Sequence, residues 1–312
     1  MTSDPQDLVA RALAGDRRSL ARAITLVELR DPAVATALGA HSVRRRSAPG
    51  VPHVVGLTGP PGAGKSTFAD RLIGRAVDDG QRVAVVAVDP SSPFSGGAIL
   101  GDRVRMERHT GQESVFIRSL SSRGHLGGLS SATAEVVDLL DAAGFDLVLV
   151  ETVGVGQSEL GVMEVADTVL VVLTPESGDA VQAMKAGLME IADVFVVNKS
   201  DRPGADRLVR ELRRTVELTP GPGWRVPVRA ASAARDEGVD EVLDETRAHL
   251  AWCCGDGEER WSRRRGDARV RLYLDLVAET ARDAARAGLD PTLEQALRDG
   301  SITPHEAAGR AR

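Results

Sequence analysis

The residues best suited to chemistry lie in a glycine-rich segment, GPPGAGKST, at positions 59–67. It fits the pattern GxxxxGK[ST], follows an apolar run at 54–57 and opens a helix-favouring stretch. Its glycines let backbone N–H groups turn inward on a phosphate, its lysine neutralises terminal phosphates, and its serine hydroxyl can bind magnesium. The alternative, a glycine turn with an incidental lysine, is disfavoured by this strand-loop-helix setting. The residues expected to hold the phosphates are Gly59, Pro60, Pro61, Gly62, Ala63, Gly64, Lys65, Ser66 and Thr67.

A second polar segment, NKSD at 198–201, follows another apolar run and indicates which base is bound. The carboxylate of Asp201 can accept hydrogen bonds from both the N1–H and the 2-amino group of guanine, whereas adenine would leave the charge unpaired. Recognition of this kind discriminates by about 10⁴ to 10⁵. We expect Asn198, Lys199 and Asp201 to read guanine, with Ser232 and Ala233 near the guanine O6. An ordinary polar loop is the alternative.

Several acids stand where an NTPase places its magnesium. Glu151 ends the apolar run 147–150, and Gly154, three residues later, can sense the γ-phosphate through its amide. Asp89 and Asp102 are two further candidates. Together with Ser66, these acids supply more oxygen donors than one magnesium ion needs, so at least one should act without touching the metal. Alternatively, Asp89 forms an Asp-Pro turn and Asp102 caps a helix.

The glutamine that orients the attacking water in many GTPases is missing from its usual place. Val155 follows the glycine directly, and Gln157 comes only two positions later. We therefore expect slow hydrolysis by the isolated chain. Asp179, Gln182 and Lys185 lie off the apolar face of a predicted helix and are candidates to complete the site, a solvated helix surface being the alternative.

Short apolar runs alternate with helical patterns through the middle of the chain. The runs are 54–57, 83–88, 115–117, 147–150, 169–173, 194–197 and 226–228, and the expected helices are 65–77, 130–143, 180–192, 205–216 and 239–250. This alternation predicts an α/β fold with a mostly parallel central sheet, and ligands at the carboxyl ends of its strands.

The flanks differ from this central domain. Residues 7–30 carry a helical stripe that Gly15 and Asp16 should divide, and the basic stretch 41–52 is typical of a linker. Residues 258–286 predict one long charged helix whose narrow apolar stripe, including Val270, Leu274 and Val277, should pack on a second copy or a partner. Two short helices are expected at 292–297 and 304–308. The predicted organisation is an N-terminal helical extension at 1–48, a P-loop domain at 49–254 and a C-terminal helical arm at 255–312.

Composition excludes several classes of function. The chain has 312 residues, and 39 basic against 45 acidic side chains give a net charge of −6, which disfavours binding to nucleic acid or to membrane surfaces. Its two cysteines, Cys253 and Cys254, are adjacent, so neither a disulfide framework nor a CxxC zinc site is expected. No signal-peptide pattern is visible, and no apolar run approaches the roughly 18 residues that span a bilayer. We expect a cytoplasmic protein.

The sequence resembles the methylmalonyl-CoA mutase-associated GTPases, a group of P-loop GTPases that act as metallocofactor chaperones, over about residues 8–310. A generic phosphate loop would not explain three of the shared stretches. The stretches that carry the resemblance are GPPGAGKST (59–67), VDPSSPFSGGAILGDRVRM (88–106), FIRSLSSRGHLGGLS (116–130), ETVGVGQSE (151–159), GDAVQAMKAG (178–187) and VNKSD (197–201).

The resemblance implies a GTP- and GDP-binding homodimer joined by its C-terminal arm. It implies Mg²⁺ around Ser66, with Asp89, Asp102 and Glu151 available to it. It also implies a mobile third switch at 178–187, in which the partner would rearrange Gln182 and Lys185 for catalysis. The implied partner is an adenosylcobalamin-dependent methylmalonyl-CoA mutase, or a related acyl-CoA mutase. The GTPase would gate cofactor delivery, protect the mutase and help remove damaged cofactor, while the mutase accelerates GTP hydrolysis.

Two other classes of function fit a P-loop. A phosphotransferase would need an acceptor site with a base, and Asp201 would have to tolerate ATP. A nucleotide-stabilised scaffold would bind GTP without useful turnover. The chain departs from the family pattern mainly in its third switch, which is less basic than in many relatives because Ala183, Met184 and Ala186 occupy it.

Overall fold

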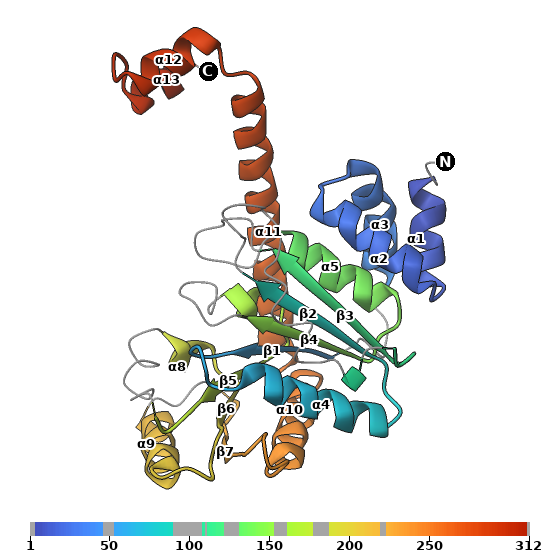
Figure 1. Cartoon of the computed structure of the whole chain (residues 1–312), viewed down its shortest axis with the longest axis vertical. Helices are drawn as coiled ribbons and strands as arrows, with labels where there is room; N and C mark the ends of the chain where they lie inside the picture. Colours follow the sequence, from blue (N-terminus) through green and yellow to red (C-terminus); the bar gives the residue numbers. More distant parts are fainter. Residues whose placement is uncertain are drawn as a thin grey trace. The chain divides into compact units, whose positions relative to one another are not determined.

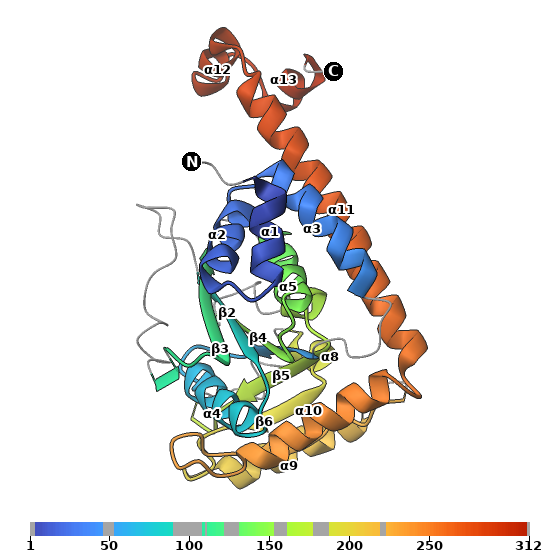
Figure 2. The same ribbon diagram turned by 90° about the vertical axis from the view of Figure 1, so that its right-hand side faces the viewer.

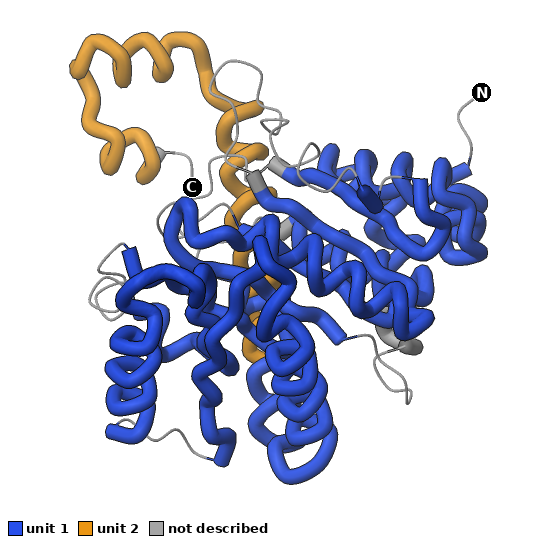
Figure 3. The backbone as a smooth tube through the Cα atoms, turned by 60° about the horizontal axis from the view of Figure 1, so that its bottom comes forward, with its two compact units in different colours: residues 1–265 blue, residues 266–312 orange. Residues whose placement is uncertain are grey.

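The computed structural model describes residues 4–45, 53–89, 108–109, 111–121, 131–152, 161–176, 187–218 and 223–310. The chain divides into two compact units, residues 1–265 and 266–312, each of which is described by itself (Figure 3). The first unit contains the sheet and the candidate site.

Among the described residues of the first unit, seven strands form one parallel sheet, which confirms the predicted α/β class (Figure 1). Their order across the sheet is β3-β2-β4-β1-β5-β6-β7. The strands are β1 (His53–Thr58), β2 (Val83–Asp89), β3 (Val115–Ser121), β4 (Leu147–Thr152), β5 (Thr168–Leu173), β6 (Val194–Val197) and β7 (Val228–Ala230). Since β1 lies between β4 and β5, the strand order reverses beside it, and ligands of such sheets bind at that point.

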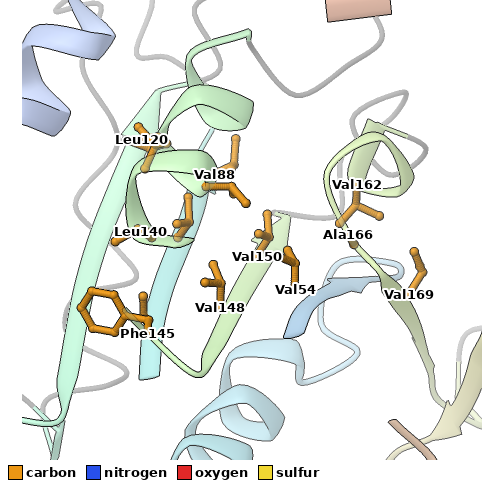
Figure 4. Packing of buried hydrophobic residues seen from close by; sticks show 14 of the residues in the cluster. Val54, Val88, Leu120, Leu140, Phe145, Val148, Val150, Val162, Ala166 and Val169 are labelled. Atoms are coloured by element: carbon orange, nitrogen blue, oxygen red, sulfur yellow. The ribbon is translucent and has the colours of Figure 1, made fainter. Parts of the chain in front are cut away.

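Alternate residues of each strand point to opposite faces of the sheet, and both faces are covered. In β2, Ala84, Val86 and Val88 join one apolar cluster, whereas Val83 and Val85 join the other. Figure 4 shows part of the first cluster. The helices that contribute to the first cluster include α5 (Ser131–Ala142), η2 (Val162–Glu164), α8 (Leu188–Ile191) and α9 (Ala205–Leu218). The second cluster lies under α4 (Lys65–Asp78) and α10 (Val239–Cys253). Burial on both faces explains why the strands read as continuous apolar runs.

Three helices precede the sheet and contribute to the first apolar cluster together with α5 (Figure 2). They are α1 (Pro5–Leu13), α2 (Arg17–Glu28) and α3 (Pro32–Arg45). The predicted break at Gly15 and Asp16 is confirmed, since the Asp16 carboxylate accepts from the amide of Arg18 and caps α2.

The predicted linker at 41–52 is wrong at its start because α3 continues to Arg45. Asp31 caps this helix by accepting from the amide of Ala33, Pro32 occupies its first position, and buried Val34 and Leu38 anchor it. Basic composition suggested an exposed loop, but the cap, the proline and the buried residues start a helix that continues to Arg45.

The long helix predicted at 258–286 is confirmed as α11 (Glu258–Ala287), which begins in the first unit and extends through the second. The second unit also contains α12 (Pro291–Arg298) and α13 (Pro304–Arg310), where two short helices were expected. Asp290 caps α12 by accepting from the amides of Thr292 and Leu293. Among the described residues, no helix is both long and apolar enough to cross a membrane.

Gly59 and Gly62 form a matched pair that tests how tightly the phosphate loop is held against the sheet. Both have positive φ, 135° and 77°, but a Cβ on Gly59 would lie 2.1 Å from the carbonyl oxygen of Val172, whereas a Cβ on Gly62 meets no atom within 4 Å. We expect Gly62→Ala to cost about 1 kcal/mol from backbone strain alone. Gly59→Ala adds steric overlap and should cost about 2–5 kcal/mol. Urea denaturation measures both, and equal losses would contradict the close approach to β5.

Candidate nucleotide-binding site

The predicted phosphate loop connects the end of β1 to the start of α4. Gly64 is the N-cap of α4, with φ of 85° and no side chain to satisfy the first amides of the helix. The Nζ atom of Lys65 is buried and donates to the carbonyl oxygens of Gly59, at 2.7 Å, and Pro60, at 3.1 Å. The first amides of α4, the helix dipole and a lysine ammonium group thus converge on one loop, which is an arrangement that binds phosphate.

Ser66 and Glu151 meet beside this loop, although 85 positions separate them in the sequence. Register brings them together, since Leu57 of β1 pairs with Glu151 of β4. The Ser66 hydroxyl donates to Oε1 of Glu151 at 2.6 Å, and both residues are buried.

This pair provides hard oxygen donors of the kind that Mg²⁺ prefers. Asp89 ends β2, the strand next to β4, whereas Asp102 lies outside the described residues. The described residues contain no group of three or more His, Cys, Asp or Glu able to hold a metal ion.

Asn198 connects the phosphate loop to the segment at 231–233. It directly follows β6 and is buried. Its Nδ2 donates to the carbonyl oxygen of Ala63 at 2.8 Å, while its Oδ1 accepts from the amide of Ala233 at 3.1 Å. Three segments that the sequence predicted to share a site are therefore brought together.

Asp201 and Ser232 lie in direct contact at the edge of this site. The Ser232 hydroxyl donates to Oδ1 of Asp201 at 2.7 Å, and Arg235 lies 3.5 Å from Oδ2. The hydrogen bond from Ser232, aided by a backbone amide and by the charge of Arg235, holds the pKa of Asp201 below its usual range. The carboxylate is therefore ionised at neutral pH and able to accept hydrogen bonds.

Lys199 adopts a left-handed backbone conformation, with φ of 56°, which is uncommon for a side chain of this kind. Its Nζ lies 3.4 Å from Oε2 of Glu176, a carboxylate that also pairs with Arg202. The turn after β6 is thus fixed by backbone geometry and by ion pairs.

Two arginines that sequence reasoning missed position the segment at 231–236. Arg71 donates through Nε to the carbonyl oxygen of Ala233 at 3.0 Å, and Arg75 lies 3.2 Å from Asp236 and 2.7 Å from Asp240. Arg71 and Arg75 are four residues apart on α4 and therefore share one helix face. That spacing was visible in the sequence, but their acceptors follow more than 150 residues later and could not be identified from it.

The remaining predicted site residues lie outside the described part of the chain. These are Gly154, Asp179, Gln182 and Lys185, together with Asp102. The helix expected at 180–192 is described only as α8, which starts at Leu188.

A parallel α/β sheet, a phosphate loop that opens a helix, and a neighbouring NKxD segment together define a P-loop GTPase. The family model described as "Methylmalonyl Co-A mutase-associated GTPase MeaB" matches residues 20–289. The chain belongs to this family, and it is a GTPase that hydrolyses GTP to GDP and phosphate.

Individual relatives agree with this assignment. A Pyrococcus abyssi protein named as a candidate GTPase is 46% identical over 310 residues, which cover 97% of this chain and 94% of that protein. The mouse mitochondrial methylmalonic aciduria type A homolog is 35% identical over 319 residues, covering 94% of this chain and 75% of its own length. The crystal structure of a LAO/AO transport system kinase superposes with a TM-score of 0.71 at 28% identity, covering 99% of this chain and 97% of that one.

Replacing Asn198 tests its role as the connection between two loops. Asn198→Ala removes two buried hydrogen bonds, so we expect it to lower the free energy of unfolding by about 2 kcal/mol and to weaken guanine-nucleotide affinity. Thr246→Ala is the control, because this buried hydroxyl bonds only the nearby carbonyl of Leu243 in α10. It should cost about 1 kcal/mol and leave affinity unchanged. Denaturation and calorimetric titration measure both effects, and unaltered affinity in Asn198→Ala would contradict this role.

Replacing Ser232 tests the electrostatics of Asp201. Ser232→Ala removes the main cause of the lowered pKa, so the pKa of Asp201 should rise toward its ordinary value of 3.8. A depressed pKa in the folded state stabilises the protein above the unfolded-state pKa, and this stabilisation is lost as pH falls through the folded-state value. The stability difference between wild type and variant should therefore be larger at neutral pH than in acid.

Carboxyl NMR titration measures this shift. Asp299, whose pKa is lowered by its own hydrogen bond from Ser301, provides an internal reference that should not move. An unchanged titration of Asp201 in the variant would rule out Ser232 as the cause.

Proposed function

We propose that this GTPase is a chaperone of an adenosylcobalamin-dependent methylmalonyl-CoA mutase or a related acyl-CoA mutase. It gates delivery of the cofactor, protects the mutase and helps to reactivate it. The observation that carries this proposal is the match of residues 20–289 to a family of mutase-associated GTPases. The name of the mouse relative, which refers to methylmalonic aciduria, supports the same assignment.

In the proposed reaction, water attacks the γ-phosphate of GTP in line with the leaving oxygen. Lys65 and the amides of residues 59–67 stabilise the negative charge that moves onto the phosphate oxygens. Ser66 and Glu151 are the residues that would hold Mg²⁺, with Asp89 and Asp102 available to assist. When bound, this ion neutralises phosphate charge. The amide of Gly154 senses the γ-phosphate.

Two further residues, Gln182 and Lys185, are proposed to make this chemistry depend on the partner. The usual water-orienting glutamine is replaced by Val155, so the isolated chain is proposed to hydrolyse GTP slowly. Gln182 and Lys185 complete the catalytic site once the mutase rearranges residues 178–187. If the mutase prefers one nucleotide state, thermodynamic linkage requires it to change nucleotide affinity by the same factor.

The proposed guanine site is formed by Asn198, Lys199 and Asp201 on one side and by Ser232 and Ala233 on the other. Its support is geometric, because Asn198 and Ser232 connect these segments directly. An ionised Asp201 carboxylate matches the two donors on one edge of guanine.

The proposed active form is a cytoplasmic homodimer joined through the arm at 255–312. Its support is an apolar stripe on α11, where Val270, Tyr273, Leu274 and Val277 are 59%, 64%, 56% and 48% exposed. Their spacing places them on one helix face. A solvated stripe of this size is typical of a surface that pairs with another helix.

Replacing Asp201 tests base recognition. Asp201→Asn presents an amide to guanine in place of a carboxylate, so we expect GTP affinity to fall by about 10²-fold or more while ATP affinity changes little. Glu211→Gln, which alters an exposed carboxylate on α9 outside the proposed guanine site, is the matched control. Competition titrations with both nucleotides provide the ratio. A ratio that stays at the wild-type value would remove Asp201 from the proposed site.

The chaperone function is tested by single-turnover GTP hydrolysis with and without a purified adenosylcobalamin-dependent methylmalonyl-CoA mutase. We expect the mutase to accelerate hydrolysis by about tenfold or more, since it completes the catalytic site. Lys65→Ala should abolish turnover in both conditions and serves as the background control. If the two proteins neither form a complex nor alter the hydrolysis rate, the mutase is not the partner.

A further inference from the structure

A cavity lies within the first unit, at the opposite edge of the sheet from the phosphate loop. Its volume is about 340 Å³. Asp167 and Asp193, which line it, directly precede β5 and β6, so the cavity opens at the amino ends of the strands. Nucleotide-site residues lie at the carboxyl ends. The cavity is therefore separate from the nucleotide site, and its assignment as a binding site does not rest on the proposed function.

The walls of the cavity are mainly aromatic and apolar. All 3 tryptophans of the chain, Trp224, Trp252 and Trp261, line it. The ring of His249 stacks on Trp252 with centroids 5.7 Å apart and meets the edge of Trp224 at 4.8 Å. Further apolar surface comes from Met163, Met189 and Phe195. Large flat side chains of this kind favour a planar ligand that can stack or pack edge-on.

The polar groups of the cavity include a pair of arginines on one face of α11. Arg260 and Arg264 both line it and are four residues apart. Arg264 donates through Nε to the carbonyl oxygen of Met163 at 3.3 Å and through Nη1 to Asp193 at 3.2 Å. Its Nη2 atom is buried and has no hydrogen-bond partner among the described residues. The two guanidinium groups give this wall of the cavity positive charge that can pair with an acidic group of a ligand.

Two of the three acidic residues that line the cavity are already engaged. Asp193 is shared between Arg264 and His249, and Asp167 accepts two hydrogen bonds from Arg265, at 2.8 and 3.0 Å. The third, Glu190, lies on α8, whereas both arginines lie on α11. The α11 side of the cavity therefore favours the negatively charged end of a ligand.

Two reactive-looking residues do not make the cavity a catalytic or metal site. Burial raises the pKa of the Cys253 thiol to about 12, so it is protonated and a poor nucleophile at neutral pH. Burial also lowers the pKa of His249, which keeps the imidazole neutral. Both therefore act as walls of a binding site.

We propose that this cavity binds a small planar aromatic carboxylic acid. The ring packs among the tryptophans, and the carboxylate lies beside Arg260 and Arg264 on the α11 side of the cavity. A volume of 340 Å³ stands at the small end of the range for ligand pockets, which indicates a compound of about a dozen non-hydrogen atoms. The location of all three tryptophans also gives the site a direct spectroscopic readout.

The test uses 1-naphthaleneacetate as the probe and 1-naphthaleneacetamide as its neutral isostere, titrated into the full-length protein by calorimetry and followed by tryptophan quenching. We expect saturable binding of the acid with a Kd below about 1 mM, and binding of the amide weaker by about fivefold or more. Arg264→Gln should remove this preference. Absence of saturable binding, or equal affinity for acid and amide, would overturn the proposal.

Two substitutions that fill the cavity from different elements check where the probe binds. Ala192→Phe and Val226→Phe replace small lining residues, and either should weaken binding by about tenfold or more. Leu29→Phe is the matched control, because Leu29 is an exposed residue outside the cavity. Unchanged GTP affinity shows that each variant is folded. Probe affinity that is the same in both folded filling variants as in wild type would place the probe elsewhere and refute the site.

Discussion

The nucleotide site depends on one buried amide side chain. Asn198 donates to the phosphate loop and accepts from the loop after β7, so it fixes the distance between the part of the site that holds phosphate and the part proposed to read the base. Both the donor and the acceptor of this amide are used, so replacing Asn198 by another side chain of the same size removes at least one of the two hydrogen bonds. The arginines of α4 then hold the second loop from the other side. The two loops that a nucleotide would contact are therefore held at a fixed distance from each other.

The sheet separates two kinds of binding surface. At the carboxyl ends of its strands, polar loops place amides, a lysine and carboxylates around the candidate nucleotide site. At its amino edge, the tryptophans and buried ion pairs surround a largely apolar cavity. A parallel sheet produces this division because every strand runs in the same direction, so its loops fall into two groups at opposite edges.

The sequence predicted the parts of this structure that depend on local patterns. The strands that are buried on both faces, such as β1, β4 and β5, were found because they form continuous apolar runs, and the phosphate loop was found because its glycines and lysine are neighbours. The last residues of the helix at Pro32–Arg45 were predicted as linker because they are basic, and β7 lies two residues beyond its expected start. The contacts of Arg71 and the walls of the cavity join residues far apart in the chain, so only the fold reveals them. The roles of Gln182 and Lys185 stay predictions.

Helix α10 begins at Val239, beside the loop that carries Ser232, and ends at Cys253, which lines the cavity. Its 15 residues contain neither glycine nor proline, and at about 1.5 Å per residue they form a stiff rod roughly 22 Å long. Because such a rod resists bending, a shift or tilt imposed at one end changes the position of the other. Helix α10 thus links the two edges of the sheet in addition to the strands themselves.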